Sequence, residues 1–282
     1  MNWITDFITF PFLQKALIGC LILAVICGVL SPMIVAKRFA FMGSSIAHGA
    51  LLGVSIALFL IDYILPPESP MTSLFVFAIT TLVTLVAATP LALTTFRQKL
   101  PSDALIGLFF TATMGLGLLI HQSLGPGKGD LLSYLFGNIL MLSTIDLMIL
   151  LILGLLIFFL IWIKRSHWIL FLYDEEAAFI QGLPTKRYHL IFFLLLTLVI
   201  VSGLKISGVI LINSFLLIPG LFALKFAPSA KSTFTYSLGF SLMSALTGVI
   251  LANGLNLSTG PTLAVTQVIF YLGSQIRDLR RH

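Results

Sequence analysis

The stretch Asp174-Glu175-Glu176-Ala177-Ala178-Phe179-Ile180-Gln181-Gly182-Leu183-Pro184 lies inside residues 164–187, a polar interruption between apolar segments of membrane length. Its acids suit the positive end of a helix dipole, and Asp174 is a natural N-cap. Gly182 can adopt the left-handed conformation that ends a helix, and Pro184 prevents continuation. The pattern predicts a helix of about two turns that presents alanines and two large apolar residues. Because so short a helix is marginal alone in water, we expect it to dock against another surface.

The composition is that of a membrane protein. Of the 282 residues, 59% are hydrophobic and 9% are charged, and the mean hydropathy is +1.10. Soluble domains carry about 25% charged residues. The net charge of +6 does not indicate nucleic acid, because the basic residues fall in short loops between apolar segments. We therefore expect a single transmembrane domain over residues 1–282, with membrane lipid and no nucleic acid around it.

Nine apolar segments approach the length of about 20 residues that a bilayer-spanning helix needs. These predicted spans are 13–36, 43–62, 71–94, 103–121, 144–163, 188–204, 206–225, 232–253 and 258–276. Residues 131–142 are too short to cross and predict a re-entrant or surface helix, Met1–Phe10 predicts an interfacial helix, and Lys205 is expected in a tight outer turn. The fold class is therefore all-α, a polytopic membrane bundle of about eight or nine transmembrane helices.

The basic residues also predict the orientation. If residues 164–187 face the cytoplasm, only Lys15, Lys128 and Lys205 of the 16 Lys and Arg residues fall outside. The positive-inside rule strongly prefers this arrangement to its mirror image. It places the N-terminus outside, and it places the C-terminus and the short 174–182 helix in the cytoplasm.

No catalytic constellation is present in the sequence. Gly125-Pro126-Gly127-Lys128-Gly129-Asp130 lacks the spacing of a phosphate loop and is interpreted as a turn. Cys20 and Cys27 lie in the first apolar segment away from acids and histidines, so packing is favoured over redox or metal chemistry. The protein is not expected to be an enzyme, and any energy that it uses must come from another chain.

His48 is the only ionisable side chain expected in the middle of a span. Ser44 lies one helical turn before it on the same face, and Gly49 and Gly53 form a small-x-x-x-small pair that permits close helix contact. An ionisable residue inside a membrane indicates function, and neutral imidazole is a common ligand for zinc and similar cations. The alternative is a histidine that only hydrogen-bonds a neighbouring helix.

Other polar residues in the spans predict less specific roles. Asn213 must face protein or a pathway, because its amide cannot stay unsatisfied in lipid, and a hydrogen bond between helices is slightly favoured. His121 is interpreted as an interfacial anchor. Asn256, with Gly260-Pro261, is interpreted as a turn before the last span.

Several ordered motifs resemble the permease subunits of zinc/manganese-type ABC importers almost from end to end. They are Ala40-Phe41-Met42-Gly43-Ser44-Ser45-Ile46-Ala47-His48, Asp130-Leu131-Leu132-Ser133-Tyr134-Leu135-Phe136-Gly137-Asn138, the Tyr173–Leu183 segment, Ser214–Pro219 and Ser258–Thr262. The resemblance implies a homodimer in a bacterial inner (cytoplasmic) membrane, two separate cytoplasmic ATPase subunits that use ATP, and an extracytoplasmic metal-binding protein. A divalent metal, zinc or manganese, would be the substrate, with no cofactor bound permanently.

The resemblance also assigns residues to roles. Asp174, Glu175, Glu176, Ala177, Ala178 and Gly182 correspond to the segment that couples to the ATPase, and His48 corresponds to the family's histidine and is the expected metal ligand. With His48, we also expect Ser44, on the same face of its helix, and Asn213 along the ion pathway. The chain departs from the family where Ser44 replaces an aspartate and Asn256 an acid, with Asp62, Asp130 and Asp146 as possible compensation. The alternatives are an ABC permease for an iron chelate or vitamin, a secondary transporter, which should carry buried acids, and a membrane scaffold.

Overall fold

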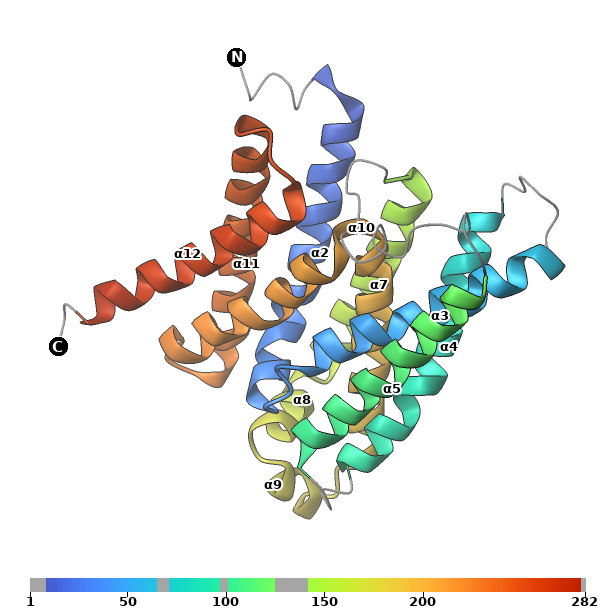
Figure 1. Cartoon of the computed structure of the whole chain (residues 1–282). Helices are drawn as coiled ribbons and strands as arrows, with labels where there is room; N and C mark the ends of the chain where they lie inside the picture. The colour runs from blue at the N-terminus through green and yellow to red at the C-terminus, as the bar shows by residue number, and fades with distance from the viewer. Residues whose placement is uncertain (1–8, 65–70, 97–100, 125–141, 280–282) are drawn as a thin grey trace.

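The computed structural model describes residues 9–64, 71–96, 101–124 and 142–279, and all regular secondary structure in these ranges is helical (Figure 1). Its helices are α2 (Pro11–Ala36), α3 (Met42–Ile64), α4 (Thr72–Phe96), α5 (Ser102–Ser123), α7 (Thr144–Ile163), α8 (Arg165–Tyr173), α9 (Glu175–Ile180), α10 (Thr185–Phe226), α11 (Ala230–Gly254) and α12 (Thr259–Leu279). The predicted turn at 125–130 and nearly all of the predicted helices at 1–10 and 131–142 lie outside the described residues.

Eight helical segments in the described part of the chain are long and apolar enough to cross a membrane. They are α2, α3, α4, α5, α7 and α11, together with two halves of α10, Thr185–Leu204 and Ser207–Phe226. Each one matches a predicted span to within a few residues, because a run of about 20 apolar residues is itself the requirement for crossing a bilayer. The all-α polytopic bundle is therefore confirmed.

The break inside α10 lies at Gly208, which has a φ of 70° and a ψ of 174°. This backbone region is accessible essentially to glycine alone, because any Cβ atom would clash there. The turn predicted at Lys205 is therefore placed slightly too early. The prediction relied on the charge of Lys205, whereas the turn is made by Gly208, three residues later.

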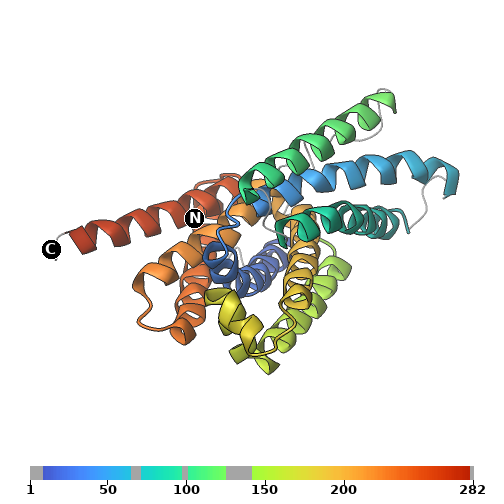
Figure 2. The ribbon, with the colours of Figure 1, turned by 90° about the horizontal axis from the view of Figure 1, so that it is seen from below.

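The core of the bundle lies around α2 and α10, which pack against each other. Helix α2 also contacts α7 and α11, and α3 packs beside α4 and α5 (Figure 2). At the tightest contact, the Gly220 amide donates to Ser31 Oγ at 2.7 Å, and a Cβ atom on Gly220 would lie 2.5 Å from the Ser31 carbonyl oxygen. Cys20 and Cys27 are both fully buried free thiols of this core, as the packing interpretation predicted.

Helix α12 follows a turn in which Asn256 adopts a φ of 51°, so the predicted turn is confirmed at that residue. Gly260 and Pro261 instead lie in the first turn of α12. The helix is not among the eight apolar segments, and it extends away from the bundle (Figures 1 and 2). Near its C-terminal end, Gln275 accepts a hydrogen bond from Lys225 at the end of α10. Helix α12 therefore runs from the end of α11 to the level of the end of α10.

Candidate functional site

His48 lies on α3 as expected, one turn after Ser44, and its side chain is half-buried. Its Nδ1 lies 2.8 Å from the Ser44 carbonyl oxygen and 3.4 Å from Ser44 Oγ. On its other side, the imidazole meets the ring of Phe110 edge-on, with 4.9 Å between the centroids. Histidine and serine are thus brought together, with an aromatic ring of α5 beside them.

The bond to the Ser44 carbonyl fixes the tautomer of His48. A carbonyl oxygen only accepts hydrogen bonds, so Nδ1 must carry the proton and donate it. In the neutral ring this leaves Nε2 unprotonated, with a lone pair available to a cation. Metal-ligating histidines are commonly oriented by such a bond from their other ring nitrogen. The geometry therefore suits a ligand, and the bond that it makes is within its own helix rather than between helices.

Glycines bring α3 close to its neighbours around His48. A Cβ atom on Gly49 would lie 3.0 Å from the ring of Phe109 in α5, and one on Gly53 would lie 2.8 Å from the Thr80 carbonyl oxygen in α4. The predicted close contact is confirmed, and it occurs within this chain. These glycines allow α4 and α5 to support the helix that carries His48.

Asn213 lies on the second half of α10 and reaches the start of α3. A Cβ atom on Gly43, the residue before Ser44, would lie 3.2 Å from Asn213 Oδ1. This oxygen is buried without a hydrogen-bond partner among the described residues, so the interhelical bond that the sequence favoured is not made by it. Buried polar groups are almost always satisfied, and an unpaired one requires an explanation such as water or an ion.

Acidic ligands are scarce in the described part of the chain. No three His, Cys, Asp or Glu side chains there lie close enough together to hold a metal ion. Asp146, which was considered as compensation for Ser44, accepts hydrogen bonds from the amide and hydroxyl of Ser143 in a capping box at the start of α7. One copy of the described chain therefore offers at most an incomplete ligand set around His48.

Helix α9 forms as its sequence predicts. Asp174 caps it by accepting from the Ala177 amide at 2.8 Å, and Gly182 adopts a φ of 80° directly after it. Pro184 then caps the next helix, α10. The preceding helix, α8, packs against α9 on the side of the bundle (Figure 1) and buries Trp168 and Phe171. The predicted capping chemistry is confirmed at both ends.

The orientation of α9 differs in part from the expected docking face. Ala178 is fully buried, so its side chain packs inward and cannot meet a partner. Phe179 and Ile180 are 71% and 82% exposed, and Glu176 is also exposed. The exposed surface of α9 therefore consists of Phe179, Ile180 and Glu176, whereas Ala178 attaches the helix to the bundle.

Glu175 ties α9 to α2 through an ion pair that the sequence did not predict. Its carboxylate pairs with the Lys37 ammonium, which also lies 3.9 Å from the centre of the Phe171 ring. Lys37 is the C-cap of α2 and is followed closely by α3, the helix of Ser44 and His48. The ion pair therefore joins α9 to the end of α2, from which a short loop leads to the helix of Ser44 and His48.

Two further buried polar side chains were missed from the sequence. His189 on α10 is 3% exposed, its Nε2 lies 3.2 Å from Thr95 Oγ1, and Phe39, Phe96 and Phe193 surround it. Gln267 on α12 is fully buried, and neither of its amide atoms has a partner among the described residues. In the sequence, both could have been recognised as polar residues inside long, mostly apolar segments.

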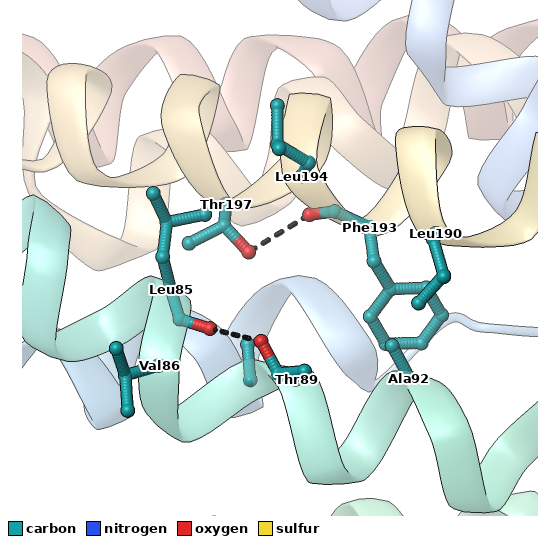
Figure 3. Close-up of a pocket in the computed structure, with 9 residues that line it drawn as sticks. Leu85, Val86, Thr89, Ala92, Leu190, Phe193, Leu194 and Thr197 are labelled. Atoms are coloured by element: carbon teal, nitrogen blue, oxygen red, sulfur yellow. Dashed lines mark hydrogen bonds between the residues drawn. The ribbon is translucent and has the colours of Figure 1, made fainter. Parts of the chain in front are cut away.

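A hollow of about 300 Å³ between α4 and α10 is not an ion site (Figure 3). Its walls are apolar apart from Thr89 and Thr197. The two hydroxyls donate to carbonyl oxygens of their own helices, those of Leu85 and Phe193, each at 2.8 Å. Because its walls are mostly apolar and include no charged side chain, the hollow suits hydrocarbon rather than a cation.

The comparisons with known proteins agree with this architecture. Residues 9–278 match the ABC 3 transport family. The chain is 29% identical to a probable iron transport system membrane protein of Haemophilus influenzae, over 96% of this chain and 95% of that protein. It is 28% identical to the manganese transport system membrane protein MntC of Halalkalibacterium halodurans, over 94% of this chain and 87% of that one. The solved structure of PsaBC from Streptococcus pneumoniae in complex with Fab superposes with a TM-score of 0.80 and 28% identity, covering 97% of this chain and 94% of that one.

The fold is that of a multi-pass helical membrane protein with a short helix exposed at one end. The chain belongs to the ABC 3 transport family, as the resemblance of its motifs implied.

Proposed function

We propose that this protein is the permease subunit of an ABC importer for divalent metal ions, and that His48 contacts the ion as it passes. The observation that carries the proposal is the hydrogen bond from His48 Nδ1 to the Ser44 carbonyl oxygen at 2.8 Å. It leaves Nε2 free to bind a cation on a helix of membrane length. Asn213 of α10 lies beside the start of that helix, and its side-chain oxygen has no hydrogen-bond partner among the described residues, so it offers a second neutral ligand atom to the pathway.

The proposed partners include a second copy of this permease, separate ATPase subunits and an extracytoplasmic metal-binding protein. A single described chain has no complete metal-ligand set, so two copies would supply two histidines across a shared axis in a bacterial inner membrane. Separate ATPase subunits would dock on the exposed Phe179 and Ile180 of α9, and an extracytoplasmic metal-binding protein would deliver the ion. The relatives reported above are named for iron and manganese, so these two ions take precedence over zinc as first substrates to test.

The test is metal uptake by the complex reconstituted in vesicles. His48→Ala should lower uptake by at least about tenfold, the usual effect of disturbing a metal site, while assembly and basal ATP hydrolysis persist. His121→Ala removes a histidine from the end of α5 and serves as the control, which should transport normally. Free manganese, free iron, free zinc and chelated iron are each added as competitors in the same assay. The ion that most inhibits uptake then identifies the preferred substrate.

If His48→Ala imports metal at the wild-type rate, the assignment of His48 is wrong. Should the alanine variant not assemble, His48→Gln retains a polar side chain of similar size without the imidazole. Normal uptake by a well-assembled His48→Gln complex would equally refute metal contact. Uptake of the chelate alone, with no free ion transported, would favour the iron-chelate permease instead.

A further inference from the structure

A second cavity, of about 240 Å³, lies among α2, α7, α8 and α11, away from His48. Its walls combine two kinds of residue. Arg165 of α8 and Lys231 of α11 contribute cationic groups, and apolar side chains such as Phe158 of α7 and Phe234 of α11 contribute most of the remainder. A cavity with both kinds of wall requires a ligand that is partly charged and partly apolar.

The two cations have no acidic counterpart in the described part of the chain. No ion pair is found there for Arg165 or Lys231, and both residues are exposed. Arg165 instead lies 5.5 Å from the centre of the Trp162 ring, a weak interaction that leaves its hydrogen-bond donors free. Two uncompensated positive charges that line one cavity make it complementary to an anion, and guanidinium groups suit phosphate in particular.

The depth of the cavity in the bilayer indicates that a lipid phosphate, rather than a free phosphate ion, would bind there. Trp162 lies in the last turn of α7, an apolar segment of membrane length, and tryptophan at such a position marks the headgroup level. Arg165 comes directly after that level. Phe158, stacked on Trp162 with 5.3 Å between centroids, lies one turn deeper, and Phe234 continues the apolar wall along α11. The cavity therefore runs from the headgroups into hydrocarbon.

We propose that this cavity binds an anionic phospholipid, with its phosphate between Arg165 and Lys231 and an acyl chain against Phe158 and Phe234. Inorganic phosphate would satisfy the cations but leave the apolar wall uncovered, and a zwitterionic lipid would bring a cation of its own. Basic pockets between transmembrane helices are known to hold such headgroups. The bound lipid joins α11 to α8, which leads directly into α9, and so steadies the helix next to α9.

The experiment measures lipid binding by the purified full chain in a neutral detergent. Phosphatidylglycerol, phosphatidylcholine and inorganic phosphate are titrated separately, with thermal stability and native mass spectrometry as readouts. We expect phosphatidylglycerol alone to raise the melting temperature and to remain bound. The R165Q/K231Q variant should need at least about tenfold more of it, as expected for the loss of two charges near a membrane surface. The K164Q/K186Q variant removes the same charge from exposed sites outside the cavity and should change little.

A third variant tests the acyl chain rather than the charges. Thr235 lines the cavity and is exposed, so T235W should narrow the cavity without disturbing the core and should also weaken phosphatidylglycerol retention. Equal losses in R165Q/K231Q and K164Q/K186Q would overturn the proposal, because attraction would then be general. Stabilisation by phosphate alone, or by phosphatidylcholine to the same degree, would also overturn it, as would normal retention by T235W.

Discussion

A single helical turn prepares His48 for its proposed role. The Ser44 carbonyl oxygen accepts the Nδ1 proton, so the protein sets the tautomer without a carboxylate in the membrane. Ser44 itself contributes a neutral hydroxyl where related permeases are expected to carry an aspartate. A divalent ion at this site would therefore meet imidazole and neutral oxygen donors, a combination that retains a hard cation weakly and releases it readily.

Ser44→Asp should therefore strengthen metal retention. The added carboxylate would lie one turn from His48 on the same face, and the number of charged ligands strongly tunes the affinity for a divalent cation. We expect the purified complex to hold metal at least about tenfold more tightly through gel filtration, as measured by elemental analysis, and to turn over more slowly in vesicles. Ser44→Asn is the uncharged control of the same shape. Equal metal retention by the Asp and Asn variants would show that position 44 does not face the ion.

Among the elements, helix α9 buries one side against the bundle and exposes the other. Ala178 packs inward, and Glu175 joins Lys37 at the end of α2. The apolar side chains of Phe179 and Ile180 are left in solvent, where large exposed hydrophobic residues usually mark an interaction site. One side of α9 is thus attached to the bundle and the other is exposed, which is the arrangement that the proposed docking of an ATPase subunit requires.

Phe179→Asp should separate ATP hydrolysis from transport. An exposed aromatic anchor of an interface typically contributes about 2 kcal/mol or more, and a charge in its place would weaken docking further. Metal uptake and the stimulation of the ATPase should fall together, while the permease still inserts and folds, because Phe179 makes no part of the core. Tyr63→Asp changes another exposed aromatic residue, at the far end of α3, and should have little effect. Full ATPase stimulation by Phe179→Asp would remove α9 from the docking surface.

For the whole molecule, the sequence was informative wherever one segment carries the whole signal. Apolar length predicted nine spans, eight of which match helical segments of membrane length in the described part of the chain, and the caps at Asp174 and Gly182 predicted α9. The sequence was uninformative where two distant segments must meet. The Lys37–Glu175 ion pair and the His189–Thr95 contact join residues far apart in the chain, and no pattern of residues within one segment indicates such contacts. The inward direction of Ala178 was missed for the same reason, since packing decides which face of a short helix is buried.

Whether α12 is a ninth crossing links the fold to the predicted orientation, because an odd number of crossings places the chain ends on opposite sides. Composition argues against a crossing, whereas the hydrogen bond between Lys225 and Gln275 brings the end of α12 to the end of α10. Single cysteines decide the question in a background in which Cys20 and Cys27, both buried, are replaced by alanine. An impermeant thiol reagent added outside intact cells should label Leu257→Cys, in the turn before α12, and should not label Ser166→Cys on α8.

The same reagent should leave Ile276→Cys, an exposed position near the C-terminal end of α12, unlabelled until the cells are opened. The physical reason is the positive-inside rule: Arg277, Arg280 and Arg281 follow directly and favour the cytoplasm. Labelling of Leu257→Cys and Ile276→Cys together from outside would show that α12 returns without crossing, so that eight spans leave both chain ends outside. Labelling of Ser166→Cys with protection of Leu257→Cys would invert the whole molecule, and α9 could then not meet a cytoplasmic ATPase.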